Sequence, residues 1–397
     1  MARMLVAIAG LVAATAALAT ASPTHSRPAL STSCGRFADY APAWAPNGRA
    51  VAFTRLRGSD SVSQIYRIGI DGHGLRRISG VADYSYGAAW SPDGARIAYN
   101  NFDLAAVVHI VIARSDGTAA HSVGSFQSQR EPPATFLTWS PDGSRLAYIG
   151  SAGELVVAAA AGGGDQRVIA HGATQPSWSP SGDRIAYVGL DGIVVASADG
   201  ENARLIANGA LPRWSPDGRW LAYTSRSGAG VHVIGADGTG DRVVDRTGSY
   251  PAWSRDGRRL VDATESNGRR YGVIHVIELS RGRVVTVSHD ASRRYGSDDF
   301  SPAFDSKSRG IVFTSVPALG GSELRLVRAD GHGERRLTYH CGVVDEGRGS
   351  RVYGTWLDDI ILARNHLRDT IVCGGGVDVV VADRDDRVAG SCETVRR

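Results

Sequence analysis

Residues 90–94 read Trp-Ser-Pro-Asp-Gly, and the chain repeats this phrase along most of its 397 residues. The phrase returns unchanged at 139–143 and 214–218, with variants at 44–48 (WAPNG), 178–182 (WSPSG), 253–257 (WSRDG) and 304–308 (FDSKS). Proline presets φ for one turn corner, aspartate bonds nearby backbone, and glycine accepts a positive φ. The phrase therefore predicts a hairpin turn between two strands, in preference to a catalytic or metal-binding aspartate.

Each copy of the phrase is followed by the same succession of short strands. An apolar strand such as ARIAYNN (95–101) comes first, then one such as IYRIGI (65–70), an Asp-Gly turn, and a strand such as LRRIS (75–79). One repeat thus predicts four antiparallel strands, and the repeats recur at intervals of roughly 40–50 residues, the period of propeller blades. The sequence predicts an all-β, seven-bladed β-propeller in which every blade is built from its own four strands.

The alternation of PxWSPDGxxIAY with IYxxxxDGxxxRRLT resembles the WD40-like (PD40) repeats of the TolB family of β-propellers, over about residues 37–340. The resemblance implies the fold more than an activity, because the same repeat occurs in propellers fused to peptidases and in some polysaccharide lyases. Residues 22–33, between the predicted cleavage site and Cys34, are too few for the helical N-terminal domain of TolB, so we expect no counterpart of that domain. A role in the Tol–Pal envelope system is therefore not carried over.

The N-terminus predicts export. Arg3 precedes an apolar run over 5–19, and Ala19-Thr20-Ala21 has the small-x-small form of a cleavage site. We expect a signal peptide over 1–21, a linker over 22–36, the propeller over 37–341 and a separate tail over 342–397. The mature protein is expected to have no membrane span and to be secreted, periplasmic or in the cell envelope.

The four cysteines suit an exported chain, in which an even number favours disulfides. None stands in a CxxC pair, which disfavours metal binding or redox catalysis. Cys34 and Cys341 flank the predicted ring, so we hypothesise that a bond between them closes it. Cys373 and Cys392 would then staple the tail.

The tail has a different rhythm, in which Asp-x-apolar units recur. CGGGVDVVV at 373–381 resembles the nonapeptide of haemolysin-type (RTX-like) calcium-binding β-rolls. The resemblance implies calcium ligands among Asp359, Asp369, Asp378 and Asp386. Calcium needs six or more oxygens, and glycines are retained only near Asp378, so a calcium-free small solenoid is the alternative.

Composition and motifs exclude several classes of function. The net charge is +4 without basic runs, and Lys307 is the only lysine, so no nucleic-acid partner is expected. No G-x-S-x-G, HExxH or P-loop motif occurs. His109, His232 and His275 fall in third strands of different blades, where satisfied surface histidines are expected rather than a converging metal site.

The loops that lead into the first strands predict a ligand site at the mouth of the channel. They carry aromatic side chains beside charged ones, which suits a cationic, peptide-like or sugar ligand. The alternative is that the carboxylates are solvated and the tyrosines fill gaps between blades. The candidate residues are Asp39, Tyr40, Asp83, Tyr84, Tyr86, Arg130, Glu131, Tyr250, Asp298 and Asp299.

The sequence therefore predicts a secreted, monomeric, non-enzymatic propeller that recognises a protein, peptide or envelope glycan at one face. The rival hypothesis is a propeller lyase or glycan hydrolase that acts at the channel. A third is a structural wall protein attached through its tail. An enzyme requires two or three titratable groups within hydrogen-bond reach in one pocket, so clustering distinguishes the first two hypotheses.

Overall fold

A computed structural model describes most of the chain after residue 36. The described residues are 37–57, 62–80, 84–103, 105–128, 136–226, 230–264, 272–288, 297–317, 322–338, 343–344, 351–353, 360–363, 368–373, 379–390, 392 and 394–396. All regular elements within these ranges are β-strands. The predicted signal peptide, Cys34 and Cys341 lie outside the described residues, so export and the ring-closing disulfide stay predictions. Within the described part of the chain, no helix is long and apolar enough to cross a membrane.

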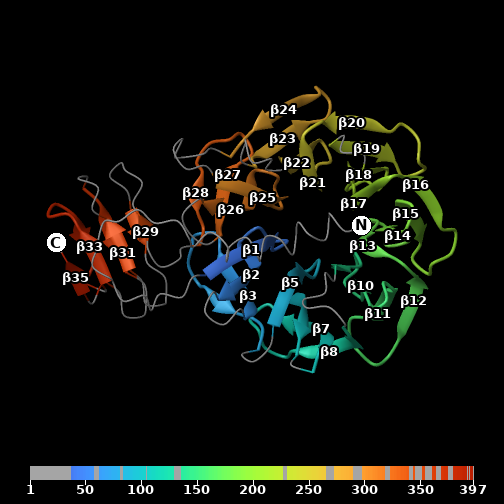
Figure 1. Cartoon of the computed structure of the whole chain (residues 1–397), viewed down its shortest axis with the longest axis horizontal. Helices are drawn as coiled ribbons and strands as arrows, with labels where there is room; N and C mark the ends of the chain where they lie inside the picture. Colours follow the sequence, from blue (N-terminus) through green and yellow to red (C-terminus); the bar gives the residue numbers. More distant parts are fainter. Residues whose placement is uncertain are drawn as a thin grey trace, which may run out of the picture. The chain divides into compact units, whose positions relative to one another are not determined.

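Seven four-stranded antiparallel sheets follow one another along the chain and form the predicted blades (Figure 1). The strands of blades one to three are β1 (Phe37–Trp44), β2 (Ala50–Arg57), β3 (Ser63–Gly69), β4 (Arg76–Arg77), β5 (Tyr84–Trp90), β6 (Arg96–Phe102), β7 (Val107–Arg114), β8 (His121–Gln127), β9 (Leu137–Trp139), β10 (Arg145–Ile149), β11 (Leu155–Ala159) and β12 (Gln166–Ala170).

Blades four to seven continue the same order. Their strands are β13 (Thr174–Trp178), β14 (Arg184–Val188), β15 (Ile193–Ser197), β16 (Arg204–Ala207), β17 (Gly209–Trp214), β18 (Trp220–Ser225), β19 (Val231–Gly235), β20 (Arg242–Asp245), β21 (Gly248–Trp253), β22 (Arg259–Thr264), β23 (Ile274–Glu278), β24 (Arg283–Thr286), β25 (Ser297–Phe304), β26 (Gly310–Pro317), β27 (Glu323–Arg328) and β28 (Arg335–Arg336). No described strand is shared between blades, which confirms the prediction of self-contained blades.

The ring closes by direct packing of blade one on blade seven. The backbone amide of Asp39 donates to the carbonyl of Ser322 over 2.8 Å, and β1 lies against β25, β26 and β27. The indole Nε1 of Trp44 donates to the carbonyl of Ala303 over 3.0 Å. Figure 1 shows the first strands on the inner side of the ring and the fourth strands on the outer side.

The repeated turn also joins neighbouring blades. Gly94 and its counterparts have positive φ values near 70°, as the turn chemistry predicts. Asp93 accepts from the amide of Ala95 and from Ser91 Oγ, so this aspartate has a structural role. The tryptophan reaches the preceding blade, as when Trp90 Nε1 donates to the carbonyl of Ala43 over 3.0 Å. The phrase therefore shapes a hairpin within one blade and fastens it to the previous one.

Each of the seven junctions between blades has its own buried apolar cluster. One aromatic side chain from the second strand of a blade recurs at the junction with the preceding blade. These aromatic residues are Phe53, Tyr99, Tyr148, Tyr187, Tyr223 and Phe313. In blade six the same position is Asp262, which pairs with His275 as Tyr223 pairs with His232. The sixth blade thus departs from the repeat in the interior of a junction.

Six of the seven first strands have an irregularity three residues before the aromatic residue. A register shift there places Ala41, Gln175, Leu211, Tyr250 and Ser301 at positive φ. A left-handed conformation costs roughly 1 kcal/mol or more for a residue with a side chain, so the surroundings must stabilise it. The freed amides bond to neighbouring blades: Leu211 N donates to Gln175 Oε1 over 2.6 Å and Tyr250 N to Thr224 Oγ1 over 3.2 Å.

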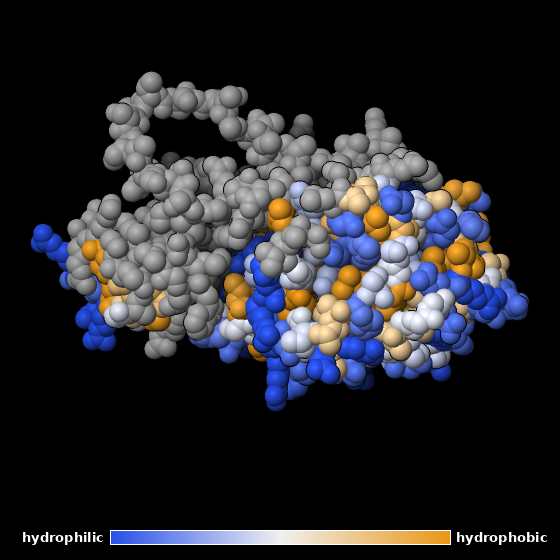
Figure 2. Space-filling model, turned by 90° about the horizontal axis from the view of Figure 1, so that it is seen from below, coloured by the Kyte–Doolittle hydropathy of each residue, from blue (hydrophilic) through white to orange (hydrophobic). Residues whose placement is uncertain are grey.

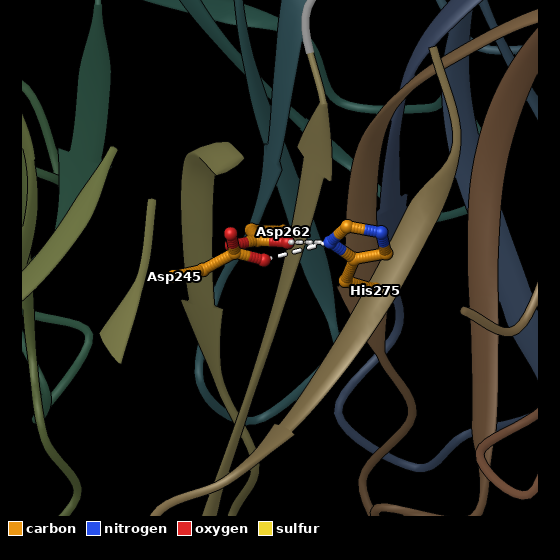
Figure 3. A group of neighbouring side chains, drawn as sticks. All are labelled: Asp245, Asp262 and His275. Atoms are coloured by element: carbon orange, nitrogen blue, oxygen red, sulfur yellow. Dashed lines mark hydrogen bonds and ion pairs between the residues drawn. The ribbon is translucent and has the colours of Figure 1, made fainter. Parts of the chain in front are cut away.

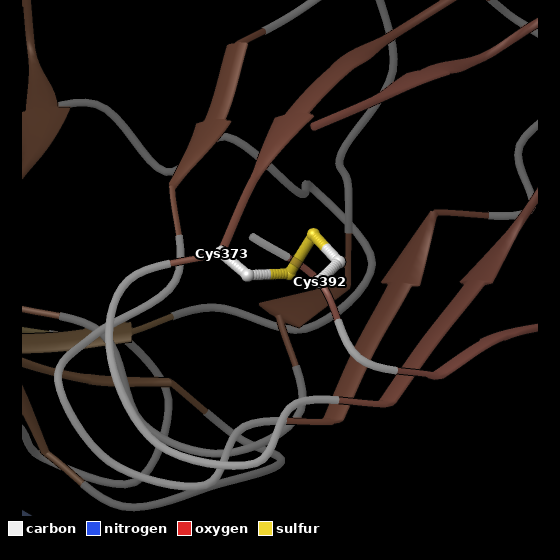
Figure 4. The surroundings of a disulfide bond; sticks show 2 residues. All are labelled: Cys373 and Cys392. Carbon is white, nitrogen blue, oxygen red and sulfur yellow. A yellow bond between two sulfur atoms is a disulfide. The ribbon is translucent and has the colours of Figure 1, made fainter. Parts of the chain in front are cut away.

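The tail forms a small parallel β-solenoid, as predicted. Its two sheets have the orders β29-β31-β33-β35 and β30-β32-β34, and their strands pair in parallel. The strands are β29 (Val343–Val344), β30 (Arg351–Tyr353), β31 (Ile360–Ala363), β32 (Thr370–Val372), β33 (Val379–Ala382), β34 (Arg387–Val388) and β35 (Thr394–Arg396). Cys373 and Cys392 form a disulfide across a sequence separation of 19 residues (Figure 4). The predicted staple of the tail is confirmed.

Two of the four predicted calcium ligands fall within the described residues. Asp386 is buried, and its carboxylate accepts from the amides of Asp369 and Asp383 over 2.8 and 2.7 Å. Asp369 is buried as well. Asp359 and Asp378 lie outside the described residues. The carboxylate of Asp386 thus holds the backbone of the solenoid, and calcium binding stays a prediction.

Candidate functional site

The residues predicted at the channel mouth are only partly described. Asp83, Arg130 and Glu131 lie outside the described residues, as does the side chain of Asp298. On the side of the molecule seen in Figure 2, hydrophilic and hydrophobic residues are interspersed among the coloured atoms. That side therefore offers no single apolar surface among its coloured atoms to mark a docking site.

Asp39 is buried in blade one and does not face solvent. Its two carboxylate oxygens accept from Nε and Nη2 of Arg55 over 2.7 and 2.8 Å. The two-pronged pair satisfies both charges inside the blade. Burial raises the pKa of the neighbouring Tyr40 to about 12, with a further contribution from the charge of Asp39. Asp39 and Tyr40 therefore help to hold the first blade together.

Asp299 occupies the corresponding place in blade seven and is also buried. Burial raises the pKa of this carboxyl to about 6, although the nearby hydroxyl groups of Ser315 and Ser288 oppose the shift. Its backbone amide donates to the carbonyl of Gly272 over 3.1 Å. The alternative of solvated loop carboxylates is therefore wrong for Asp39 and Asp299, which are both buried. Their role toward a ligand stays a prediction.

The predicted tyrosines divide into two kinds. Tyr84 and Tyr86 are half-buried against the cluster between blades two and three, where the Tyr84 ring meets the Phe102 ring edge-on at 6.4 Å. They fill the gap between blades, which was the alternative reading of these residues. Tyr250 is 38% exposed and stands at the positive-φ position of β21.

A cleft of about 680 Å³ opens between blades seven and one, at the end of the blades opposite to the predicted mouth. The cleft exists because a stack of arginine on an aromatic ring, which recurs between other blades, is missing here. Arg96, Arg145, Arg184 and Arg259 each begin a second strand and place a guanidinium 4.7–5.5 Å from the aromatic ring of the next blade's turn. In blade seven the same position is Gly310, so no arginine among the described residues covers Trp44.

The walls of this cleft are charged. Arg259, Arg309, Arg328 and Arg335 line it together with Asp305 and Asp330. Several of these groups are already engaged: Arg259 Nη2 donates to the Ser308 carbonyl, Arg335 Nη2 to the Ile70 carbonyl, and Arg328 pairs with Asp330. The arginines outnumber the acids, so the cleft favours an anionic group beside the indole of Trp44.

A second group of functional side chains lies between blades five and six, where Asp262 replaces the repeated aromatic (Figure 3). His275 in β23 directs Nδ1 toward Asp245, the last residue of β20 in blade five, over 2.7 Å. The same nitrogen lies 3.7 Å from Oδ1 of Asp262. Asp262 is fully buried, and neither of its oxygens has a hydrogen-bond partner among the described residues.

The pKa values of the two carboxyl groups in this cluster are shifted in opposite directions. Burial, and then the negative charge of Asp245, raise the pKa of Asp262 well above its usual value. Burial also opposes ionisation of Asp245, but hydrogen bonds from His275 and Thr247 outweigh it and lower the pKa of Asp245 to about 2. The carboxylate of Asp245 therefore lies beside a carboxyl group whose ionisation is opposed by burial and by the charge of Asp245 itself.

The three third-strand histidines do not converge on one another. His109 pairs with Asp103 over 3.1 Å, His232 with Asp241 over 3.2 Å, and His275 with Asp245. Each histidine therefore has a carboxylate partner, as predicted, but Nε2 of His232 is buried without a hydrogen-bond partner among the described residues, so the prediction of satisfied surface histidines holds only in part. His275 is nevertheless mostly buried, with 13% of its side chain exposed, and belongs to a cluster that sequence reasoning missed. The usable indication was RRLVDAT at 258–264, where aspartate stands in place of tyrosine.

Comparisons with known proteins support the fold. No protein-family model and no curated protein matches the sequence. Among solved structures, a puromycin-hydrolyzing peptidase of Mycobacterium tuberculosis is 16% identical with a TM-score of 0.59, over 76% of this chain and 53% of that one. An oligogalacturonate lyase in complex with manganese is 15% identical with a TM-score of 0.55, over 75% and 90% of the two chains.

TolB from Acinetobacter baumannii is 16% identical with a TM-score of 0.45, over 76% of this chain and 62% of that one. At these identities a likeness bears on architecture and not on activity. Together with the seven described blades, the two likenesses of higher TM-score establish that this chain has the β-propeller fold.

Proposed function

We propose that this protein is a secreted, non-enzymatic propeller that binds an anionic glycan in the cleft between blades seven and one. The observation that carries the proposal is the uncovered indole of Trp44 beside arginine side chains in a cavity of about 680 Å³. Ligand pockets commonly measure about 300–1,000 Å³, so a short oligosaccharide fits this volume. An acidic sugar offers an apolar ring face for the indole and a carboxylate for a guanidinium.

Binding is favoured over catalysis because the carboxylates of the cleft accept hydrogen bonds from backbone amides of the turns to which they belong. Asp305 Oδ1 accepts from the amides of Lys307 and Arg309 over 3.0 and 2.8 Å. Asp330 Oδ1 accepts from the amide of His332 over 3.0 Å, and this bond lowers the pKa of Asp330. A general acid needs a raised pKa and a free proton. These carboxylates are therefore suited to shaping the cleft, and the arginines to holding a ligand.

The test uses the repeat itself to close the cleft. Gly310→Arg would restore the side chain that Arg96 and its counterparts supply elsewhere, and would place it over Trp44. A Cβ at Gly310 would lie 3.2 Å from Asp305 Oδ2 and 3.8 Å from the Trp44 ring, so the backbone accepts the change with a small adjustment. The matched control is Ala50→Arg, which adds the same residue at the same repeat position in blade one.

The probe is a short oligogalacturonate, with a neutral oligosaccharide of equal length and a polyglutamate peptide as comparisons. Calorimetric titration should show binding of the oligogalacturonate to the wild type and to Ala50→Arg, and a loss of about ten-fold or more for Gly310→Arg. Equal affinity of the two variants would contradict the cleft as the site. Preference for polyglutamate would replace the glycan with an acidic peptide, and new sugar products would favour the lyase or hydrolase hypothesis.

A further inference from the structure

The junction between blades five and six departs from the other six in its interior, and this departure is independent of the cleft. Phe53, Tyr99 and their counterparts each bury an aromatic ring against the preceding blade. Asp262 brings a carboxyl group to the same place, facing an acid from blade five and an imidazole from its own blade. We propose that Asp245, Asp262 and His275 bind one divalent ion of the Zn²⁺ or Mn²⁺ class at this junction.

The first argument is the isolation of Asp262. Its exposed fraction is 0%, and both carboxylate oxygens lack a hydrogen-bond partner among the described residues. A buried polar group without a partner costs roughly 1–3 kcal/mol, and an unpaired charge costs more. Chains avoid such groups unless something satisfies them, and a cation directly satisfies a carboxylate. An aromatic residue at this place, as in the other blades, would avoid the cost altogether.

The second argument is the geometry of the three side chains. One ligand atom from each residue can be chosen so that all lie within 4.8 Å of one another. In a tetrahedral site with bonds of about 2.0–2.2 Å, ligand atoms stand roughly 3.3–3.6 Å apart. The two distances from His275 Nδ1, 2.7 Å to Asp245 and 3.7 Å to Asp262, lie on either side of that range. Small side-chain movements would therefore seat an ion.

The donor set indicates the class of ion. Two carboxylates and one imidazole nitrogen provide three protein ligands, which leaves further positions for water. The imidazole disfavours Ca²⁺ and Mg²⁺, which take oxygen ligands, whereas Zn²⁺ and Mn²⁺ accept both donor types. Because Asp245 belongs to blade five and the other two ligands to blade six, the ion would clamp two blades together.

The experiment measures metal content and thermal stability of the full, tag-free mature protein after treatment with a chelator. Equilibrium dialysis against Zn²⁺ and, separately, Mn²⁺ should give one ion per chain bound in this site. A hundred-fold excess over the dissociation constant should raise the melting temperature by on the order of 5 °C. Failure of both ions to bind, or binding without a rise in melting temperature, would overturn the proposal.

Variants show whether the ion binds at this junction or at the predicted calcium site of the tail. Asp262→Asn should remain folded and should lose one bound ion and the rise in melting temperature. Affinity should fall by more than about ten-fold, since even outer-shell groups change metal affinity by 10–100-fold. The matched control is Asp241→Asn in blade five, which removes a carboxylate from the His232 pair but should leave the metal response unchanged.

A second variant keeps the proposal testable if Asp262→Asn does not fold. Asp262→Tyr restores the aromatic residue of the repeat. In blade five the equivalent Tyr223 packs beside Gly209. In blade six Gly248 is the equivalent glycine, and it leaves room for the ring. It should be folded and insensitive to either ion. Retention of the wild-type stoichiometry by Asp262→Asn or Asp262→Tyr would show that the bound ion lies elsewhere and would refute the proposal.

Discussion

In blades five and six, equivalent positions of the repeat hold different buried side chains. In blade five, Tyr223 is buried, and its hydroxyl donates to Asp241 Oδ1 over 2.8 Å beside His232. In blade six, the residue at the position of Tyr223 is Asp262. His275 pairs instead with Asp245, which belongs to blade five. The side chain of Asp241 is 42% exposed, whereas Asp245 is buried.

The difference shows how one substitution changes the character of a junction. A tyrosine satisfies its hydroxyl at the rim and contributes its ring to the core. An aspartate at the same depth has no ring to contribute and brings two oxygens that need partners. The apolar cluster between blades five and six is built around Leu260 and Val233 without that aromatic ring. We therefore expect the two blades to respond in opposite directions to removal of these residues.

The largest effect is expected for Tyr223→Ala in blade five. Removal of a buried aromatic side chain typically costs about 3–5 kcal/mol of the free energy of unfolding. Denaturant unfolding at neutral pH should show this loss, and Tyr223→Phe should show only about 1 kcal/mol because the ring remains. A small loss for Tyr223→Ala would mean that the ring is not part of the core that stabilises blade five.

A smaller loss is expected for Asp245→Asn, measured in the presence of a chelator. The pKa of Asp245 is lowered to about 2 in the folded protein against about 3.9 in an unfolded chain. The carboxylate therefore contributes about 2–3 kcal/mol above pH 4, and this contribution disappears as the pH falls toward 2. The gap in unfolding free energy between wild type and variant should close over that range. A gap that is independent of pH would contradict the ion pair with His275.

The opposite sign is expected for Asp262→Asn in metal-free protein. Because burial raises the pKa of Asp262, the folded chain holds a proton that the unfolded chain releases above about pH 4. The wild type therefore loses stability relative to the variant as the pH rises above that value. At pH 7 the variant should be more stable by on the order of 1 kcal/mol, and the two should converge near pH 4. A variant less stable at pH 7 would show that Asp262 already has a favourable partner.

The smallest effect is expected for Asp241→Asn. Its side chain is 42% exposed, so the pair with His232 is screened by solvent. The unfolding free energy should fall by less than about 1 kcal/mol, and added salt should reduce the difference further. A loss as large as that of Asp245→Asn would remove the contrast between the two blades.

The hairpins, the strands and the number of blades were predictable because each depends on residues close together in the sequence. Turn chemistry at residues 90–94 and strand periodicity depend on neighbours within a few positions, and seven copies supply the blade count. The solenoid of the tail followed from a short repeat in the same way, and the pairing of Cys373 with Cys392 followed from the position of both cysteines in that tail. Buried Asp39 and Asp299 were misplaced because a loop-like sequence does not show that Arg55 or Ser315 faces it across a strand pair.

The sites depended on relations that no local pattern contains. Gly310 matters because four other blades supply an arginine at its position, and Trp44 meets it only where the ends of the ring come together. Asp262 was visible in the sequence as an exception to IAY, but its partner Asp245 belongs to the previous blade.

The sequence by itself determined the repeat, its hairpins and the number of blades, because those follow from backbone preferences and from the alternation of buried and exposed residues. Only the tertiary structure decided which side chains of adjacent blades meet, because that depends on the packing of whole sheets around a closed ring. An exception to the repeat becomes a cleft at Gly310 and a buried carboxyl cluster at Asp262 only through that packing.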